Sequence, residues 1–577
     1  MPEPGQSGLL CPLHEDDSPA GAPAETTDLV SAVREHERKG GVRWVWPSAA
    51  SVYQPLLLAG VRVARCHDVA LTDALLRGRD GAAGTAATPG EAGGQPAAAG
   101  RPAQQALFDP VLAGAPGPAN PRDTLDALIA VHADQVRRIA ADEHPGRFGL
   151  LVAAESAGAL VAAEMSMAGL PWRPEAHDAL LTDLLGSRPT LPGQRPARLA
   201  ELAAQVAEAF ATTCPHGRRG RQAVNPDSPA QVLAAFAADG IRLPSTRLAV
   251  LRGVDHPAVA PLLEYKELAR LHSAFGWTWL DTWVRDGRFR PEYVVGGVVS
   301  GRWASRGGGA LQIPRMLRRA VVADPGCTLV VADAAQLEPR VLAALAGDRA
   351  FAAAATAGDL YAELATAFGG DRAKAKVAML SAMYGGAGGE AGQLLAVLRR
   401  RFPAAAGYVE AAARAGEEGR VVRSVLGRTC PPPSASWRAL TEEAADPDAE
   451  RDPRAGRASR ARGRFTRNFV VQASAADWAL VMLVCLRAGL AKIDMRNEDP
   501  AVPAPPVPAS PGTGHRRPEL VFFQHDEVIV HAPREQADAV VAAVSRAAEQ
   551  ASRLVFGPIR IAFPLNTAVV DCYADAK

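Results

Sequence analysis

The sequence predicts a multidomain protein of the α+β class. Its 577 residues suggest three or four domains at about 150 residues each. Apolar residues recur every three or four positions over 124–273, which predicts helices. Short apolar runs at 328–333 and 519–532 end on acids or turn residues and predict strands. Hydrophobic residues at 48% and charged residues at 22% are typical of a folded, soluble protein.

The N-terminal part is predicted to hold a small α/β unit. Residues 1–30 contain six acids and no lysine or arginine, and we interpret them as a disordered acidic lead. Residues 31–77 alternate short strands and helices, with strands expected at 42–46 and 61–66 and helices at 49–59 and 68–76. Residues 78–123 are rich in Gly, Ala and Pro, which indicates a flexible linker.

Hydrophobic periodicity and composition divide the rest of the chain into four regions. Residues 124–285 are predicted to be helical, 286–343 mixed, 344–463 helical with a Pro/Arg-rich insertion at 431–463, and 464–577 mixed. The last region is expected to hold a long helix from about 465 to 486, a Pro-rich loop at 499–517 and the hairpin at 519–532.

Several classes of protein are disfavoured. We find no apolar run of about 18 residues, and the N-terminus is acidic, which argues against a membrane span and a signal peptide. Seven cysteines without a CxxC pair argue against a disulfide scaffold or zinc module and favour the cytoplasm.

Net charge is less informative than its distribution. The formal net charge of +1 gives no sign of a nucleic-acid partner, yet residues 300–322 carry five arginines and no acid. Residues 451–467 carry seven arginines against Asp452 alone. Only six of the 63 basic residues are lysine, and two of these lie together at Lys374 and Lys376.

Two carboxylate segments are candidates for metal binding. The apolar run LVVAD ends on Asp333, and a polar His525-Asp526-Glu527 triplet interrupts the apolar segments of the predicted hairpin. Taken alone, the first acid is more typical of a helix cap and the second of a turn. Together, two strand-end carboxylates can bind two Mg²⁺ ions, which prefer oxygen ligands.

A basic helix is predicted between these two segments. Arg372, Lys376, Leu380 and Tyr384 recur every four residues, so they share one helix face over roughly 18 Å. A solvated basic face is an equally good interpretation of this segment alone. The stripe also matches a nucleoside triphosphate, with cations for the phosphates and a ring near the base.

These segments resemble the motifs of the family A DNA polymerases. VADAAQLEPR resembles the family's first carboxylate motif, RAKAKVAMLSAMYG its nucleotide-binding helix and QHDE its second carboxylate motif. Further similarities are SGRWAS with LQIP, LLEYKELARL and RFTRNFVVQASAAD. The resemblance implies a right-hand polymerase, with an antiparallel palm sheet and helical fingers and thumb, that uses Mg²⁺, dNTPs and primer–template DNA, with a monomeric state expected.

The resemblance also implies roles for individual residues. Asp333 and Asp526 correspond to the catalytic metal ligands, and Glu527 lies beside them. Arg372 and Lys376 would bind the triphosphate, with Leu380, Tyr384 and Gln336 lining the nucleotide pocket and Glu338 crowding a ribose 2′-OH. The residues expected to contact DNA are Arg302, Arg464, Asn468, Gln472 and His525.

The chain departs from the family pattern at several positions. Ala334-Ala335 and Pro339 replace the usual residues of the first motif, Leu380 replaces an aromatic residue, and Tyr361 replaces a histidine. No metal ligand or phosphate-binding cation is lost, so we expect activity with altered rate or fidelity.

The N-terminal unit resembles part of a 3′–5′ exonuclease domain. We find no Asp-x-Glu on an early apolar strand, and Asp68 and Asp73 are expected to cap or decorate a helix. The leading hypothesis is therefore a DNA polymerase in repair or accessory replication, with proofreading lost. The alternatives are a catalytically weak DNA-binding protein and an active exonuclease.

Overall fold

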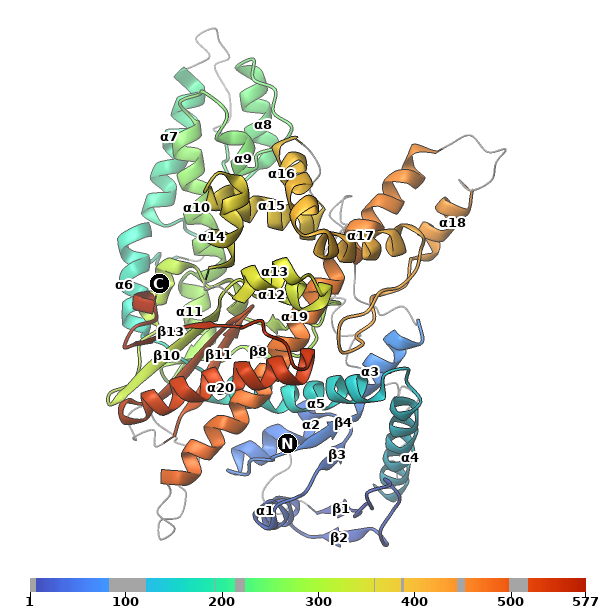
Figure 1. Cartoon of the computed structure of the whole chain (residues 1–577). Helices are drawn as coiled ribbons and strands as arrows, with labels where there is room; N and C mark the ends of the chain where they lie inside the picture. Colours follow the sequence, from blue (N-terminus) through green and yellow to red (C-terminus); the bar gives the residue numbers. More distant parts are fainter. Residues whose placement is uncertain are drawn as a thin grey trace. The chain divides into compact units, whose positions relative to one another are not determined.

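The structure of the protein is a computed structural model (Figure 1). It describes residues 7–81, 121–191, 193–212, 224–356, 359–385, 389–443, 452–497 and 517–576. The chain forms two compact units. The first comprises Met1–Ala168, Glu292–Arg306 and Asp324–Val570, and the second comprises Gly169–Pro291, Gly307–Ala323 and Asp571–Lys577.

A four-stranded antiparallel sheet forms the centre of the first unit. Its strand order is β11-β12-β10-β13, with β10 at Cys327–Ala334, β11 at Glu519–Gln524, β12 at Glu527–Pro533 and β13 at Leu565–Val570. β12 is buried throughout and β10 nearly so, as expected of apolar runs with no polar face. Helix α20 (Ala537–Phe556) packs against β10, β12 and β13. The predicted strand, the predicted hairpin and the α+β class are confirmed.

Helices flank this sheet, and the longest is α19 (Pro453–Asn497). It packs against α17 (Pro403–Glu417) and α20. The sequence predicted a helix only from about 465 to 486. The structure extends it at both ends, to Asn497 and, N-terminally, through a segment rich in Ala and Arg, which have high helix propensity. The insertion at 431–463 accordingly contains α18 (Ala435–Glu443) and the start of α19, while the loop at 499–517 lies almost wholly outside the described residues.

The other helices of this region connect β10 to α17. They are α12 (Leu337–Ala346), α13 (Arg349–Thr356), α14 (Leu360–Ala365), α15 (Arg372–Tyr384) and α16 (Gly389–Arg401). A two-stranded ladder of β8 (Glu292–Val294) and β9 (Ala304–Arg306) also belongs to the first unit.

Two helices of the described chain, α5 (Pro145–Ala168) and α19, are long and apolar enough to cross a membrane. The sequence predicts no membrane span, because it has no uninterrupted apolar run of about 18 residues. In the structure, 61% and 83% of their apolar windows are buried inside the protein, which is the environment of core helices.

The N-terminal region is ordered further toward the terminus than predicted. β1 (Gly8–Leu10) and β2 (Ala24–Thr26) form an antiparallel pair, so the expectation of disorder over 1–30 is wrong for the described residues from 7 onward. Two of its acids have structural partners, since Asp17 lies 2.9 Å from His132 Nε2 and Asp28 caps the following helix.

The α/β unit that follows contains two parallel strands and three helices. These are α1 (Leu29–Lys39), β3 (Trp44–Trp46), α2 (Ala49–Leu58), β4 (Cys66–Asp68) and α3 (Val69–Arg79). The strand predicted at 61–66 forms only from Cys66. The carbonyls of Val63 and Ala64 instead accept hydrogen bonds from Arg487, at 2.5 and 3.1 Å.

The predicted boundary at 124 is displaced. α4 (Pro121–Ala140) and α5 pack on α3 and belong to the first unit, and the second unit begins only at Gly169. α5 also contacts β4, β11 and α19. α5 is apolar on most of its sides, and such a helix is stable when it packs inside the first unit. Most of the linker predicted at 78–123 lies outside the described residues.

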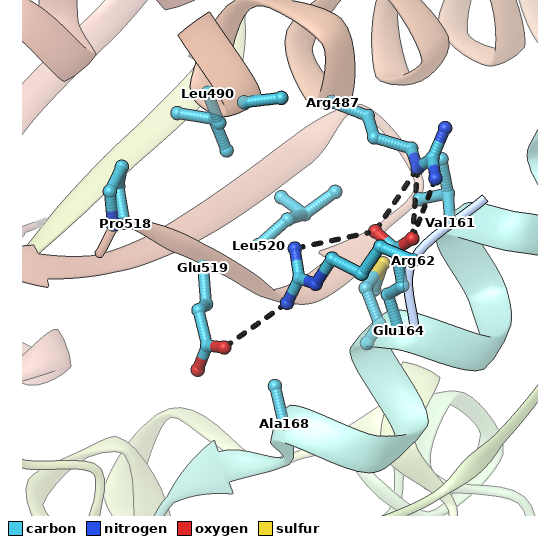
Figure 2. A pocket seen from close by; sticks show the side chains of 11 residues that line it. Arg62, Val161, Glu164, Ala168, Arg487, Leu490, Pro518, Glu519 and Leu520 are labelled. Carbon is cyan, nitrogen blue, oxygen red and sulfur yellow. Dashed lines mark hydrogen bonds and ion pairs between the residues drawn. The ribbon is translucent and has the colours of Figure 1, made fainter. Parts of the chain in front are cut away.

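Polar contacts hold the N-terminal α/β unit to the rest of the first unit (Figure 2). Arg487 of α19 pairs with Glu164 of α5 at 2.7 Å, and Tyr53 donates to the same carboxylate at 2.5 Å. Arg62 reaches Glu519 of β11 at 3.3 Å. The cavity lined by these side chains has a volume of about 30 Å³, which has room for a water molecule and not for a substrate.

The second unit is mainly helical, as predicted for this part of the chain. Its helices are α6 (Pro174–Leu185), α7 (Ala197–Thr212), α8 (Pro229–Ala238), α9 (Leu248–Leu251), α10 (Val259–Phe275) and α11 (Trp277–Trp283). A three-stranded sheet has the order β5-β7-β6, with β5 at Leu170–Pro171, β6 at Val284–Arg285 and β7 at Arg288–Phe289. Trp172, Trp279 and Phe289 pack together in its core.

Candidate active site

The three acidic residues predicted from the sequence lie at one end of the β10–β12 pair. Asp333 is directly opposite Glu527 in the antiparallel register, so their side chains lie on the same face of the sheet. The backbone N–H of Ala334 donates to the carbonyl of Asp526 at 3.0 Å, which holds the tip of the hairpin beside the end of β10. His525 and Asp526 form that tip, and His525 has a left-handed φ of 58°.

This set of donors is suited to a divalent cation. Glu527 is buried, with 4% exposure, and Asp333 is half-buried. All three side chains offer carboxylate oxygens, which are the ligands that hard cations such as Mg²⁺ prefer. The resemblance assigns the ion to Asp333 and Asp526. Among the described residues, no three His, Cys, Asp or Glu side chains are grouped closely enough to hold a metal ion.

A sharp turn after β10 positions the next two predicted residues. Gln336 has a φ of 56°, and α12 begins immediately after it at Leu337. The buried guanidinium of Arg340 stabilises this turn by donating to the carbonyls of Ala335 and Ala562, both at 3.0 Å. Pro339 lies in the first turn of α12, where it disrupts no hydrogen bond.

Glu338 is at the centre of a three-residue contact. Its carboxylate accepts hydrogen bonds from the guanidinium of Arg302 and from the hydroxyl of Tyr384. Burial, with the hydrogen bond to Glu338, raises the pKa of Tyr384 to about 12, so the hydroxyl keeps its proton at neutral pH. Glu338 thus joins α12, α15 and the segment before β9.

The predicted face of α15 is present. Arg372, Lys376 and Tyr384 are exposed and Leu380 is half-buried. The helix is anchored by its buried residues Ala375, Ala378, Met379 and Met383. The helix ends at Gly385 with a φ of 81°. This left-handed φ favours glycine. A Cβ here would also lie 3.0 Å from Cγ of the Arg464 side chain, which would have to shift slightly.

Arg372 has a partner that the sequence analysis missed. Its Nε lies 2.7 Å from Oδ2 of Asp359, the residue that caps α14. The other carboxylate oxygen, Oδ1, accepts from Gln336 Nε2 at 2.6 Å. The position of Asp359 before a helical segment signals a cap, but no local pattern shows that its second oxygen reaches a residue 13 positions away.

The residues predicted to bind DNA come from three segments: Arg302 precedes β9, three residues lie on α19, and His525 lies at the hairpin tip. Arg464, Asn468 and Gln472 follow one face of α19 at four-residue spacing. Gln472 hydrogen-bonds Tyr384. Partial burial lowers the pKa of His525, and the positive charge of Arg302 lowers it further.

Asn468 carries a polar atom that is not satisfied by the protein. Within the described part of the chain, its buried Oδ1 has no hydrogen-bond partner. Such an atom is costly unless a ligand or water supplies a donor.

Comparisons with known proteins agree on one family. Residues 198–569 match the family model described as DNA polymerase family A. The chain is 27% identical to DNA polymerase I of Chloroflexus aurantiacus over 49% of this chain and 29% of that protein. It is 26% identical to the thermostable DNA polymerase I of Thermus aquaticus over 56% of this chain and 37% of that protein. The chain therefore spans less than two-fifths of the length of these relatives.

A solved structure has a similar fold. The POL domain of Pol1 from M. smegmatis, in complex with DNA primer-template and dNTP, superposes with a TM-score of 0.58 at 19% identity, covering 78% of this chain and 74% of that one. Polymerases of this family use divalent metal ions, in keeping with the carboxylates at the end of β10. Because the family model covers most of the chain, this protein belongs to DNA polymerase family A.

Proposed function

We propose that this protein is a template-directed DNA polymerase that adds deoxynucleotides to the 3′ end of a primer. The observation that carries the proposal is that backbone pairing places Asp333, Asp526 and Glu527 at one end of the β10–β12 pair. Glu338 and Tyr384 connect this end of the sheet directly to the cationic helix α15.

The residues at this site suit nucleotidyl transfer. Asp333 and Asp526 would hold two Mg²⁺ ions, which when bound activate the primer hydroxyl and neutralise phosphate charge. Lys376 and Arg372 would bind the triphosphate and stabilise the charge that develops on it. Glu338 would exclude a ribose 2′-OH, and its contacts with Arg302 and Tyr384 fix its position.

DNA would lie along α19 and the hairpin tip. Arg464, Asn468, Gln472 and His525 offer a cation and hydrogen-bonding groups, which suit the recognition of backbone and duplex shape rather than sequence. The similar M. smegmatis structure contains primer-template and dNTP, which supports the same ligands for this chain.

We further propose that proofreading is lost. Asp68 Oδ2 and Oδ1 accept from the backbone N–H groups of Ala49 and Leu71, at 2.7 and 3.0 Å, so this carboxylate caps both α2 and α3. Asp73 pairs with Arg77 on the surface of α3. Neither acid is then available to a nuclease metal site. The proposed setting is repair or accessory replication in the cytoplasm, by a monomer.

Primer extension on templates of different sequence tests the proposal. Wild-type protein should add the complementary dNTP in Mg²⁺, and an Asp333→Ala/Asp526→Ala double variant should not. Equal extension by the two proteins would refute it. Primer–template binding without extension by the wild type would instead favour the alternative of a weakly catalytic DNA-binding protein. Degradation of labelled single-stranded DNA that depends on Asp68 would refute the loss of proofreading.

A further inference from the structure

The carboxylate of Asp359 is held firmly beside Arg372. Oδ1 accepts from the backbone N–H groups of Tyr361 and Ala362, at 2.9 and 3.2 Å, and from Gln336 Nε2 at 2.6 Å. Gln336 is fixed in turn, because its Oε1 accepts from the N–H of Leu360 at 2.9 Å. Oδ2 is therefore presented to Arg372 Nε at 2.7 Å by a rigid frame.

The pair is open to solutes. The side chain of Arg372 is 55% exposed and that of Asp359 is 39% exposed. The ring of Tyr361 lies 5.6 Å from the guanidinium carbon and supports it from one side. Burial opposes ionisation of Asp359, but the hydrogen bonds from Arg372 and Gln336 lower its pKa, so it is charged at neutral pH.

Lys376 differs from Arg372 in this respect. It is exposed one turn further along the same face of α15, and among the described residues no ion pair engages it. Of the two cations proposed to bind a triphosphate, Arg372 therefore has a neighbouring carboxylate, that of Asp359, whereas Lys376 has no ion pair among the described residues.

We propose that Asp359 determines the affinity for phosphates by competing with them for Arg372. This inference rests on the proposed function. A phosphate that approaches the guanidinium must displace a carboxylate whose position is fixed, and the two anions repel each other. The same repulsion acts on pyrophosphate after the reaction. Asp359 therefore weakens the binding of the incoming nucleotide and favours release of the pyrophosphate product.

The Asp359→Asn variant isolates the charge. Asparagine caps a helix as well as aspartate and retains an oxygen for the Gln336 amide. An exposed ion pair predicts an effect of about two- to fivefold. We expect the KM for dATP and the inhibition constant of inorganic pyrophosphate to fall by that factor. The dissociation constant for dATP, titrated by calorimetry into a complex with dideoxy-terminated primer–template, should fall equally without any chemical step.

Two controls separate competition from a general effect of charge or folding. Asp371 caps α15 through the N–H groups of Ala373 and Lys374, so Asp371→Asn removes the same charge one residue from Arg372 and should leave the dATP affinity within about 1.5-fold. In an Arg372→Ala background, Asp359→Asn should change nothing. If the Asp359→Asn variant does not fold, Asp359→Ser can be used instead, because serine also caps a helix and carries no charge.

An unchanged or weaker dATP affinity in Asp359→Asn would overturn the inference, as would equal gains in Asp359→Asn and Asp371→Asn. These outcomes leave the proposed function intact. If wild-type protein binds dATP but does not extend a primer, the proposed function fails, and the titration still decides the role of Asp359.

Discussion

The hydroxyl of Tyr384, the last residue of α15, donates a hydrogen bond to the carboxylate of Glu338 in the first turn of α12. The two residues are 46 positions apart in the sequence, and the contact joins α15 to α12, the helix that follows the strand carrying Asp333. The residue expected to exclude a 2′-OH is therefore held in place by the helix that would bind the nucleotide.

Removing this carboxylate should weaken the selection of deoxynucleotides. We expect Glu338→Ala to raise the ratio of rNTP to dNTP incorporation by about tenfold, equivalent to about 1.4 kcal/mol, because the space for a 2′-OH opens. Single-nucleotide incorporation with matched ATP and dATP measures the ratio. Glu363→Ala, at an exposed position on α14, is the control, and an equal ratio in both variants would contradict the assignment.

Lys376 should contribute more to catalysis than its neighbour Lys374. Loss of a cation directed at the developing phosphate charge costs about 100-fold in kcat/KM, and we expect this for Lys376→Ala. Lys374 is two residues away and so lies on another face of α15. Lys374→Ala should lose less than about threefold. Steady-state primer extension compares them, and similar losses would indicate a general electrostatic effect instead.

A buried ion triad should be important for stability. Arg428 pairs with Glu155 of α5 and, at 3.2 Å, with Asp477 of α19, and the three side chains are at most 8% exposed. Arg428→Met leaves two carboxylates buried without their cation, which should cost about 3–5 kcal/mol of unfolding free energy.

Urea unfolding followed by circular dichroism measures this loss. The control is Arg420→Met, which removes an exposed pair with Glu418 and should change the unfolding free energy by less than about 0.5 kcal/mol. Equal urea midpoints for the two variants would show that the triad contributes nothing.

His67 should make the protein less stable in acid. It is 6% exposed, and burial lowers its pKa to about 4, against about 6.5 in the unfolded chain. The unfolded state therefore binds the proton more readily below pH 6.5. The free energy of unfolding is therefore unaffected by His67 above pH 6.5 and decreases as the pH falls from 6.5 toward 4.

The expected loss between pH 7 and 4.5 is about 2–3 kcal/mol of unfolding free energy. His67→Gln should remove this part of the pH dependence, since glutamine does not titrate. The exposed His36 provides the control variant His36→Gln. Identical pH profiles for wild type and His67→Gln would contradict the assigned pKa.

Local patterns were sufficient for the elements that carry the site. The apolar run ending on Asp333 was sufficient to predict the end of a strand. The polar triplet from His525 to Glu527, between two apolar segments, was sufficient to predict the hairpin. The four-residue spacing from Arg372 to Tyr384 was likewise sufficient to predict the exposed face of α15.

Contacts between distant segments were not predictable in this way. Nothing near Asp359 indicates that its second oxygen pairs with Arg372, and nothing near Val63 indicates that its carbonyl accepts from Arg487. The order of the acidic N-terminal segment depends on partners such as His132, more than 100 positions away. Each of these depends on tertiary packing, which a single sequence does not encode locally.

The most direct test of the account is the rate of single-nucleotide incorporation by Asp333→Asn and Asp526→Asn across a range of Mg²⁺ concentrations. Asparagine preserves side-chain shape and removes the charge that would hold the metal, and Asp575→Asn changes an exposed acid as control. We predict Mg²⁺-dependent extension by wild type and Asp575→Asn, with a loss of about 1,000-fold in each of the other two variants. Incorporation by Asp333→Asn or Asp526→Asn within about tenfold of wild type would contradict the central claim that these carboxylates form the catalytic site.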